Sequence, residues 1–331
     1  MFPEDLIESA SGDIPAAPSR SEQPARFALP EEAHVYEPPK QRLWLHALLL
    51  VLTLFTTTLV GAHMQYNFSH NLPFVDLERY SAIFTTGLQS WSAFASGLPF
   101  SLTLLTILMA HELGHYLACV YYRVDASLPY FLPSPMPVTG TFGAFIRIRS
   151  AIRSKHILFD IGIAGPIAGF IFLLPALGVG LAFSKVLPGI NHQGTIQLGV
   201  PALEWIAQRL IFPGVPTADI YLHPVARAAW VGMFATALNL LPVGQLDGGH
   251  VVYALLGRTQ KWLTNVFLIA LLPMGRFFWD GWYFWAAMLF FFARKHPPLY
   301  DLSDIGAART RLGVAALIIF LLCFSLAPIV G

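Results

Sequence analysis

Apolar residues in this chain gather in long runs, and polar segments separate these runs. A helix needs about 20 residues to cross the hydrocarbon core of a bilayer. We therefore expect spanning helices at 43–61, 98–122, 157–183, 225–241 (broken at Pro242 and continuing to 256), 262–274, 277–293 and 312–330. The run 262–274 is short enough to be a re-entrant segment. The pattern predicts an all-α polytopic membrane protein with six or seven transmembrane helices.

Lysines and arginines divide the connecting segments into two classes. The segments 62–97 and 184–224 are poor in both residues. The other segments hold the basic clusters, which are Lys40, Arg42, Arg123, Arg147, Arg149, Arg153, Lys155, Arg258, Lys261, Arg294, Lys295, Arg309 and Arg311. By the positive-inside rule the N-terminus is cytoplasmic. Seven spans keep every cluster inside, whereas six would place Arg294 and Lys295 outside.

The composition supports the prediction of a membrane protein and argues against a nucleic acid partner. A soluble domain carries about 25 % charged residues, whereas this chain carries 12 % and is 55 % hydrophobic. The net charge of +1 gives no basic surplus, so we expect no nucleic acid partner. The two cysteines, Cys119 and Cys323, lie in separate apolar runs, and we expect them to pack as free thiols.

The first 42 residues are polar and rich in proline, and they contain no apolar core of a signal peptide. We expect a disordered cytoplasmic tail, with a docking tail for a partner as the alternative. The lack of a signal-like segment favours a prokaryotic cytoplasmic membrane.

A short β-ribbon is expected between the second and third spans. Residues 124–137 contain four prolines and cannot form a helix. Directly after them, Ile146 and Ile148 alternate with Phe145, Arg147 and Arg149. This is the period of a strand, so we expect a ribbon at the membrane surface.

The stretch LMAHELGHYLA, residues 108–118, places a glutamate between two histidines inside an apolar span. His111 and His115 are four residues apart and share one helix face. Glu112 can reach a metal-bound water without being a ligand, and H-E-x-x-H on a helix is typical of a zinc site with the glutamate as general base. The alternative is a chance match with two packed histidines. It is disfavoured because burying these three side chains needs compensation.

A catalytic zinc site needs a third protein ligand and an open position. In ALNLLPVGQLDGGH, residues 237–250, Asp247 follows a proline break whose backbone must line a cavity or be buried in protein. His250 is a rival ligand, although a hydrogen bond within the bundle is its more ordinary role. Asp280 is a second rival, which we interpret as part of an interfacial turn. Asn239 either stabilises substrate or a developing oxyanion, which makes it a catalytic candidate, or caps the broken helix.

These motifs together resemble the site-2 protease family of intramembrane zinc metalloproteases, peptidase family M50. The resemblance covers about residues 98–256. It is carried by HELGH at 111–115, the Gly-rich GIAGPIAGF at 162–170 and NLLPVGQLDGG at 239–249.

The resemblance implies a Zn²⁺ ion held by His111, His115 and Asp247, with Glu112 as the catalytic acid and base. It also implies that an extended substrate pairs with the ribbon. The residues concerned are Gly140, Thr141, Phe142, Gly143 and Ala144. Many members carry a PDZ domain, but the segment 184–224 is too short for one, so the chain resembles the PDZ-less type.

The expected organisation is a tail at 1–42, a first span and external loop at 43–97, a catalytic membrane core at 98–256 and C-terminal spans at 257–331. The predicted function is regulated intramembrane proteolysis, in which a zinc metalloprotease hydrolyses peptide bonds within or near transmembrane segments of membrane proteins in the bilayer. The alternatives are a membrane metal-ion transporter and an inactive metal-binding scaffold. A transporter would spread its ligands along a path, and a scaffold would not need Glu112. The sequence does not specify an oligomeric state.

Overall fold

The computed structural model describes residues 41–74, 85, 87–152, 154–193, 196–257, 259–292 and 303–330, all within one compact unit, 40–331. Nearly all of the expected N-terminal tail therefore lies outside the described residues. The same holds for Lys40, Arg153, Arg258, Arg294 and Lys295, which the expected topology uses.

The described chain is mostly helical. Its helices are α1 (Leu43–Ser69), α3 (Trp91–Ala95), α4 (Leu98–Tyr121), α5 (Lys155–Ala182), α6 (Ala202–Ile211), α7 (Pro224–Asn239), α8 (Asp247–Leu256), α9 (Thr259–Phe277), α10 (Gly281–Phe292) and α11 (Ala307–Cys323), with 3₁₀ turns η2 (Ile190–His192) and η3 (Thr217–Asp219). Each expected span overlaps a helix, and the interrupted span 225–256 covers both α7 and α8. The break expected at Pro242 is confirmed, because α7 ends before it and α8 begins after it.

Two expected boundaries are wrong. The run 262–274 is not the short helix, because α9 extends over 19 residues. Its polar first turn continues the helix beyond the apolar run, and there the Gln260 side chain donates to Thr264 Oγ1 at 2.9 Å. The last helix ends at Cys323, and the chain then forms the strand β6 (Ile329–Val330) instead of continuing to 330 as a helix.

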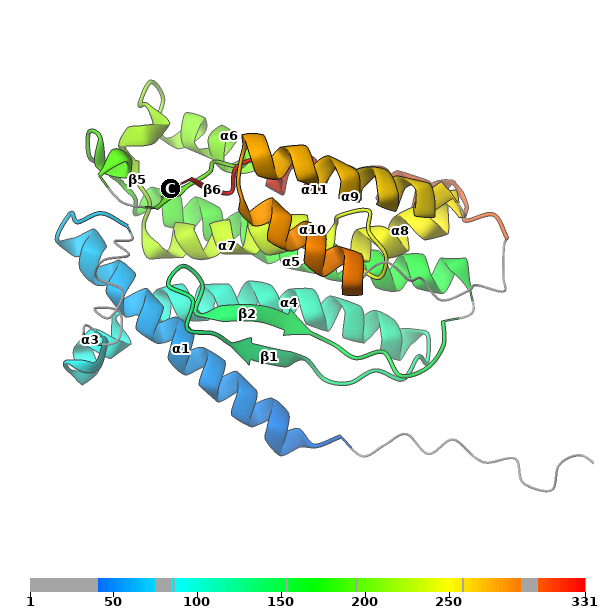
Figure 1. Cartoon of the computed structure of the whole chain (residues 1–331). Coiled ribbons are helices and arrows are strands. Elements are labelled where there is room, and N and C mark those ends of the chain that lie inside the picture. The colour runs from blue at the N-terminus through cyan, green and yellow to red at the C-terminus, as the bar shows by residue number, and fades with distance from the viewer. Residues whose placement is uncertain are drawn as a thin grey trace, which may run out of the picture. The chain divides into compact units, whose positions relative to one another are not determined.

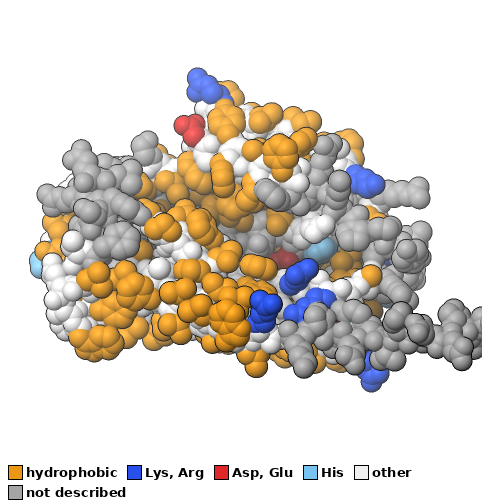
Figure 2. Space-filling view, turned by 60° about the horizontal axis from the view of Figure 1, so that its bottom comes forward, with side chains coloured by type: hydrophobic (Ala, Val, Ile, Leu, Met, Phe, Trp, Pro, Cys, Tyr) orange, Lys and Arg blue, Asp and Glu red, His pale blue; other side chains and the backbone are white. Residues whose placement is uncertain are grey.

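Among the described residues, three helices are long and apolar enough to cross a membrane: α1, α3 together with α4, and α5. The helix α10 has 12 residues, which gives a length of about 18 Å against a hydrocarbon core of about 30 Å. The outer surface fits a lipid environment. Figure 2 shows a face with large hydrophobic areas, on which some Lys and Arg side chains group near the centre and others lie at the margins. The protein is an integral membrane protein.

The expected ribbon exists, and its second strand falls on residues that the resemblance assigns to it, but the alternation at 145–149 does not form the strand. β1 (Tyr130–Pro133) pairs antiparallel with β2 (Thr141–Phe145), with Tyr130 opposite Phe145. Past Phe145, the expected alternation yields only an isolated bridge between Ala126 and Ile148. The reason is that side chains hold the later segment: Ser127 Oγ accepts from Arg147 N, and Ser150 Oγ accepts from Asp125 N.

The ribbon lies along the bundle, with β1 against α1 and β2 against α4 (Figure 1). Two smaller sheets lie near one end of the bundle. In them β3 (Lys185–Val186) pairs with β5 (Ile220–Tyr221), and β4 (Gln197–Leu198) pairs with β6.

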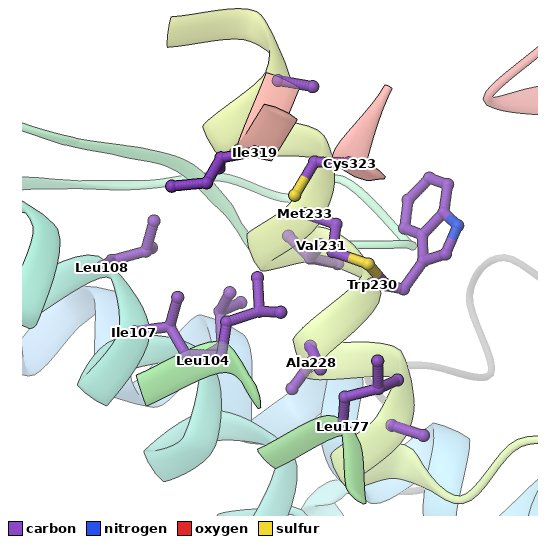
Figure 3. Close-up of a cluster of buried hydrophobic side chains, with 14 of the residues drawn as sticks. Leu104, Ile107, Leu108, Leu177, Ala228, Trp230, Val231, Met233, Ile319 and Cys323 are labelled. Atoms are coloured by element: carbon purple, nitrogen blue, oxygen red, sulfur yellow. The ribbon is translucent and has the colours of Figure 1, made fainter. Parts of the chain in front are cut away.

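The centre of the bundle is formed by α4, α5 and α7. Figure 3 shows their apolar side chains in one buried cluster with residues of α11. Its labelled members are Leu104, Ile107, Leu108, Leu177, Ala228, Trp230, Val231, Met233, Ile319 and Cys323. Both cysteines are buried and free, as expected.

Helix contact at this centre depends on glycine. A Cβ on Gly180 of α5 would lie 2.2 Å from the backbone nitrogen of Ala226 on α7, whereas a Cβ on Gly178 would meet nothing within 4 Å. We predict that Gly180→Ala lowers the free energy of unfolding by about 1–3 kcal/mol through overpacking. Gly178→Ala is the matched control in the same helix, and it should leave stability unchanged or slightly raised. Thermal unfolding in detergent measures both, and equal effects would contradict the packing argument.

Candidate metal centre

His111 and His115 lie one turn apart on α4 and direct their Nε2 atoms to the same point. The two Nε2 atoms are 3.1 Å apart. Asp247 Oδ2 lies 3.1 Å from Nε2 of His111 and 3.2 Å from Nε2 of His115. Within the described chain, these three residues form the group of His, Cys, Asp or Glu side chains whose ligand atoms all lie within 4.8 Å of one another. Both histidines are buried, and the Asp247 side chain is 16 % exposed.

Asp247 reaches this point because of the break between α7 and α8. It is the first residue of α8, so the partial positive charge of the helix N-terminus favours its carboxylate. Gly248 follows it directly, and a Cβ there would lie 2.0 Å from the carbonyl oxygen of Leu240. The glycine therefore lets the first turn of α8 fold back onto the end of α7, which brings an acid from a distant segment to the histidines.

The Gly-rich face of α5 makes room for the imidazoles. A Cβ on Gly165 would lie 2.1 Å from His115 Nε2, and one on Gly169 would lie 3.1 Å from His111 Cβ. Gly162, three residues before Gly165, packs in the same way against His250. Small residues let helices approach closely in a bilayer, but the contact of these glycines with the ring atoms was not predicted from the sequence. The spacing 162, 165 and 169 follows a helical period and could have revealed it.

The orientation of His115 is fixed by the backbone. Its Nδ1–H donates to the carbonyl oxygen of Ile161 on α5 at 2.7 Å, which leaves the lone pair of Nε2 directed at the group of three. This carbonyl was also missed, because a backbone acceptor has no signature in sequence.

Glu112 is buried beside the group of three without belonging to it. The backbone of Ile146, just after β2, hydrogen-bonds to its carboxylate. Glu112 and His111 line two cavities. One, of about 120 Å³, is bounded mainly by apolar residues such as Trp285 and Leu289 of α10. The other, of about 200 Å³, also contains His115, Asp247 and His250. Both are large enough for water.

Asn239 is the last residue of α7, and its side chain turns toward the histidines. Its Nδ2 donates to His111 Nε2 at 3.1 Å. His250 lies in the wall of the larger cavity, outside the group of three. Asp280 is exposed in the turn between α9 and α10, as its interpretation as an interfacial residue requires.

Only part of the expected substrate segment reaches a cavity. Phe142, Gly143 and Ala144 line the smaller one. Gly140 instead packs on α1, where its carbonyl accepts from Thr56 Oγ1 at 2.7 Å, and Thr141 is buried and donates to the Leu132 carbonyl. Gly143 has φ +104° and open space at its Cβ position. The glycine thus leaves the cavity beside Glu112 open where a side chain would otherwise project.

The three ligand atoms fit a small tetrahedral cation. Two imidazole nitrogens and a carboxylate oxygen are a donor set that suits zinc. Ligands about 2.0–2.1 Å from a tetrahedral ion lie about 3.3 Å apart, and the separations here are 3.1–3.2 Å.

Comparisons with known proteins find one matching family and several related proteins. Residues 99–278 match peptidase family M50. The chain is 32 % identical over 247 residues to the probable zinc metalloprotease EGY1, chloroplastic, of Oryza sativa subsp. japonica. The aligned region covers 71 % of this chain and 41 % of that protein. The chain is 29 % identical over 308 residues to the protein of the same name from Arabidopsis thaliana, covering 87 % and 54 %. The chain thus spans about half the length of these relatives.

Removal of one ligand should abolish metal binding. We predict that Asp247→Ala lowers the affinity for Zn²⁺ by more than about 100-fold. Loss of a residue that only hydrogen-bonds to a metal ligand already costs about 10–100-fold, and loss of a ligand itself should cost more. Asp280→Ala removes an exposed aspartate and should bind as the wild type does. Metal content after dialysis against a weak chelator measures both, and full zinc retention in Asp247→Ala would contradict the assigned centre.

Proposed function

Because the chain belongs to peptidase family M50, we propose that it is an intramembrane zinc metalloprotease that hydrolyses peptide bonds within or near transmembrane segments of membrane proteins. One observation carries the proposal: His111, His115 and Asp247 converge beside the Glu112 carboxylate inside an apolar bundle. The zinc named for the relatives suits this donor set.

In this proposal, the Nε2 atoms of both histidines and the Asp247 carboxylate hold Zn²⁺. When bound, the ion supplies a Lewis acid and lowers the pKa of water. The Ile161 carbonyl keeps His115 in the tautomer that can be a ligand, since it accepts the proton of Nδ1.

Glu112 moves the proton. Its carboxylate accepts a proton from the attacking water and later delivers it to the leaving amine. Asn239 Nδ2, now 3.1 Å from His111 Nε2, would donate to the carbonyl oxygen of the scissile bond as negative charge develops there.

The substrate would lie along β2. A substrate helix must unwind first, because its peptide groups are hydrogen-bonded within the helix. The strand β2 lines the cavity at Phe142–Ala144 and belongs to a two-stranded sheet, so its other edge offers an extended segment a strand to pair with. Trp285 and Leu289 of α10 form the opposite side of the same cavity, so the substrate would pass between the ribbon and α10.

The finer topology belongs to the proposal as well. We infer seven spans with a cytoplasmic N-terminus, in a prokaryotic cytoplasmic membrane, with the catalytic core at 98–256. The described part of 184–224 holds α6, short strands and 3₁₀ turns, which is consistent with the PDZ-less type. The described residues gather their metal ligands at one point and not along a path, which favours a protease over a transporter.

A cleavage assay tests the proton transfer. We predict that the purified chain cleaves a tagged single-span protein whose helix is softened with Gly and Asn, and that Glu112→Gln lowers the rate by about 10²–10⁴-fold. Glu112→Gln should retain zinc, because Glu112 is not a ligand. A zinc chelator should stop the wild type, and added zinc should restore it. Equal product from wild type and Glu112→Gln would overturn the proposal.

The role of Asn239 has its own test. We predict that Asn239→Ala lowers kcat by about 10²–10³-fold, as removal of an oxyanion donor does, with little change in KM. Zinc content should stay at the wild-type level if the amide acts on substrate. If Asn239→Ala instead loses zinc in proportion to its lost activity, the amide acts by holding His111 in place and not on the substrate.

A further inference from the structure

A second buried polar site lies away from the metal centre, at the start of α7. Arg227 is 4 % exposed. Its guanidinium lies over the ring of Phe74, 3.6 Å from the centroid, and near that of Tyr221. In the part of the chain that the structure describes, its Nη2 has no hydrogen-bond partner. A buried cation without a paired anion is costly, so a partner is expected here.

Two acceptor groups on α6 also lack hydrogen-bond partners among the described residues. Glu204 and Gln208 lie one turn apart and are 2 % and 3 % exposed. Gln208 Nε2 donates to Glu204 Oε1 at 2.7 Å. This bond leaves Glu204 Oε2 and Gln208 Oε1 without partners among the described residues. Burial raises the pKa of Glu204 to about 8, an effect that nearby Arg227 opposes. A positive group at Oε2 would favour its ionised form.

The cation and the two acceptors line the same cavity of about 210 Å³. No ion pair within 4.0 Å joins Arg227 to Glu204 in the described chain, so the guanidinium and the carboxyl group face this space without touching. None of the residues lining it lines the cavities around Glu112. Arg227 and Asn239 are 12 residues apart on α7, which gives about 18 Å along the helix. The cavity is therefore a separate site.

We propose that this cavity binds a small zwitterion, with its oxyanion on Arg227 and its ammonium group on Glu204 and Gln208. Such a molecule satisfies all three unpartnered groups, because its oxyanion pairs with Arg227 and its ammonium group favours the ionised form of Glu204. A simple anion would leave Gln208 Oε1 unpaired, because an amide oxygen only accepts, and a simple cation would leave Arg227 unpaired. The volume suffices, since a cavity of about 150 Å³ already admits benzene. Free amino acids and the phosphoethanolamine headgroup of a lipid share the required chemistry.

Thermal unfolding of the full chain in detergent tests the site. The probes are L-alanine and phosphoethanolamine, with propionate and L-alaninamide as controls that lack the ammonium and the anion respectively. We expect a concentration-dependent rise in Tm with a zwitterion and none with either control. A response to alanine identifies free amino acids as the source, and a response to phosphoethanolamine alone identifies a lipid headgroup. No response to either zwitterion, or an equal response to propionate, would overturn the proposal.

Variants then locate the effect. Glu204→Gln is nearly isosteric and should remove the rise in Tm, as should Arg227→Gln. Arg209→Gln is the matched control, because Arg209 lies exposed on the same helix as Glu204, and it should respond as the wild type does. Zinc content reports whether each variant keeps its bundle intact. This test needs no proteolysis, so it stands or falls independently of the proposed function. A rise that persists in both Glu204→Gln and Arg227→Gln would show that the zwitterion binds elsewhere.

Discussion

The close approach of α4 and α5 is the contact on which the structure depends. The hydrophobic effect does not drive helices together inside a bilayer, so close packing at small residues contributes much to their association. Here Gly165 and Gly169 bring α5 onto the very face of α4 that carries His115 and His111. The contact that stabilises the bundle also encloses the imidazoles and presents the Ile161 carbonyl to one of them. The same helix contact therefore stabilises the fold and forms the site.

Much of the helical framework could be predicted from sequence, because apolar runs and proline breaks are local signals. The break before Asp247 is the best example: Pro242 and the following glycines indicated exposed backbone at membrane depth, and α8 begins with that aspartate. The position of the strands could not be predicted as well. The alternation at 145–149 is real, but pairing with Tyr130–Pro133 and the bond from Thr141 to Leu132 place β2 earlier.

The candidate site, too, could be predicted from the sequence only in part. The two histidines and Glu112 could be predicted from a five-residue motif on one helix. The glycines and the carbonyl that surround them could not, because these depend on which helix packs against α4. For the same reason, nothing local distinguished Glu204 and Arg227. In sequence they are an ordinary charge on a short amphipathic helix and a lone arginine near a helix start. Only the fold turns both toward one cavity.

Glu112 lies in the wall between two chambers of different character. The one beside Phe142 and Trp285 is bounded mostly by apolar side chains and the ribbon, whereas the one beside Asp247 contains His115, His250 and Gln245. If the peptide occupies the first and water the second, the two reactants arrive by separate routes and meet at one carboxylate. Hydrolysis then needs no alternation between them, because a bound peptide does not block the supply of water.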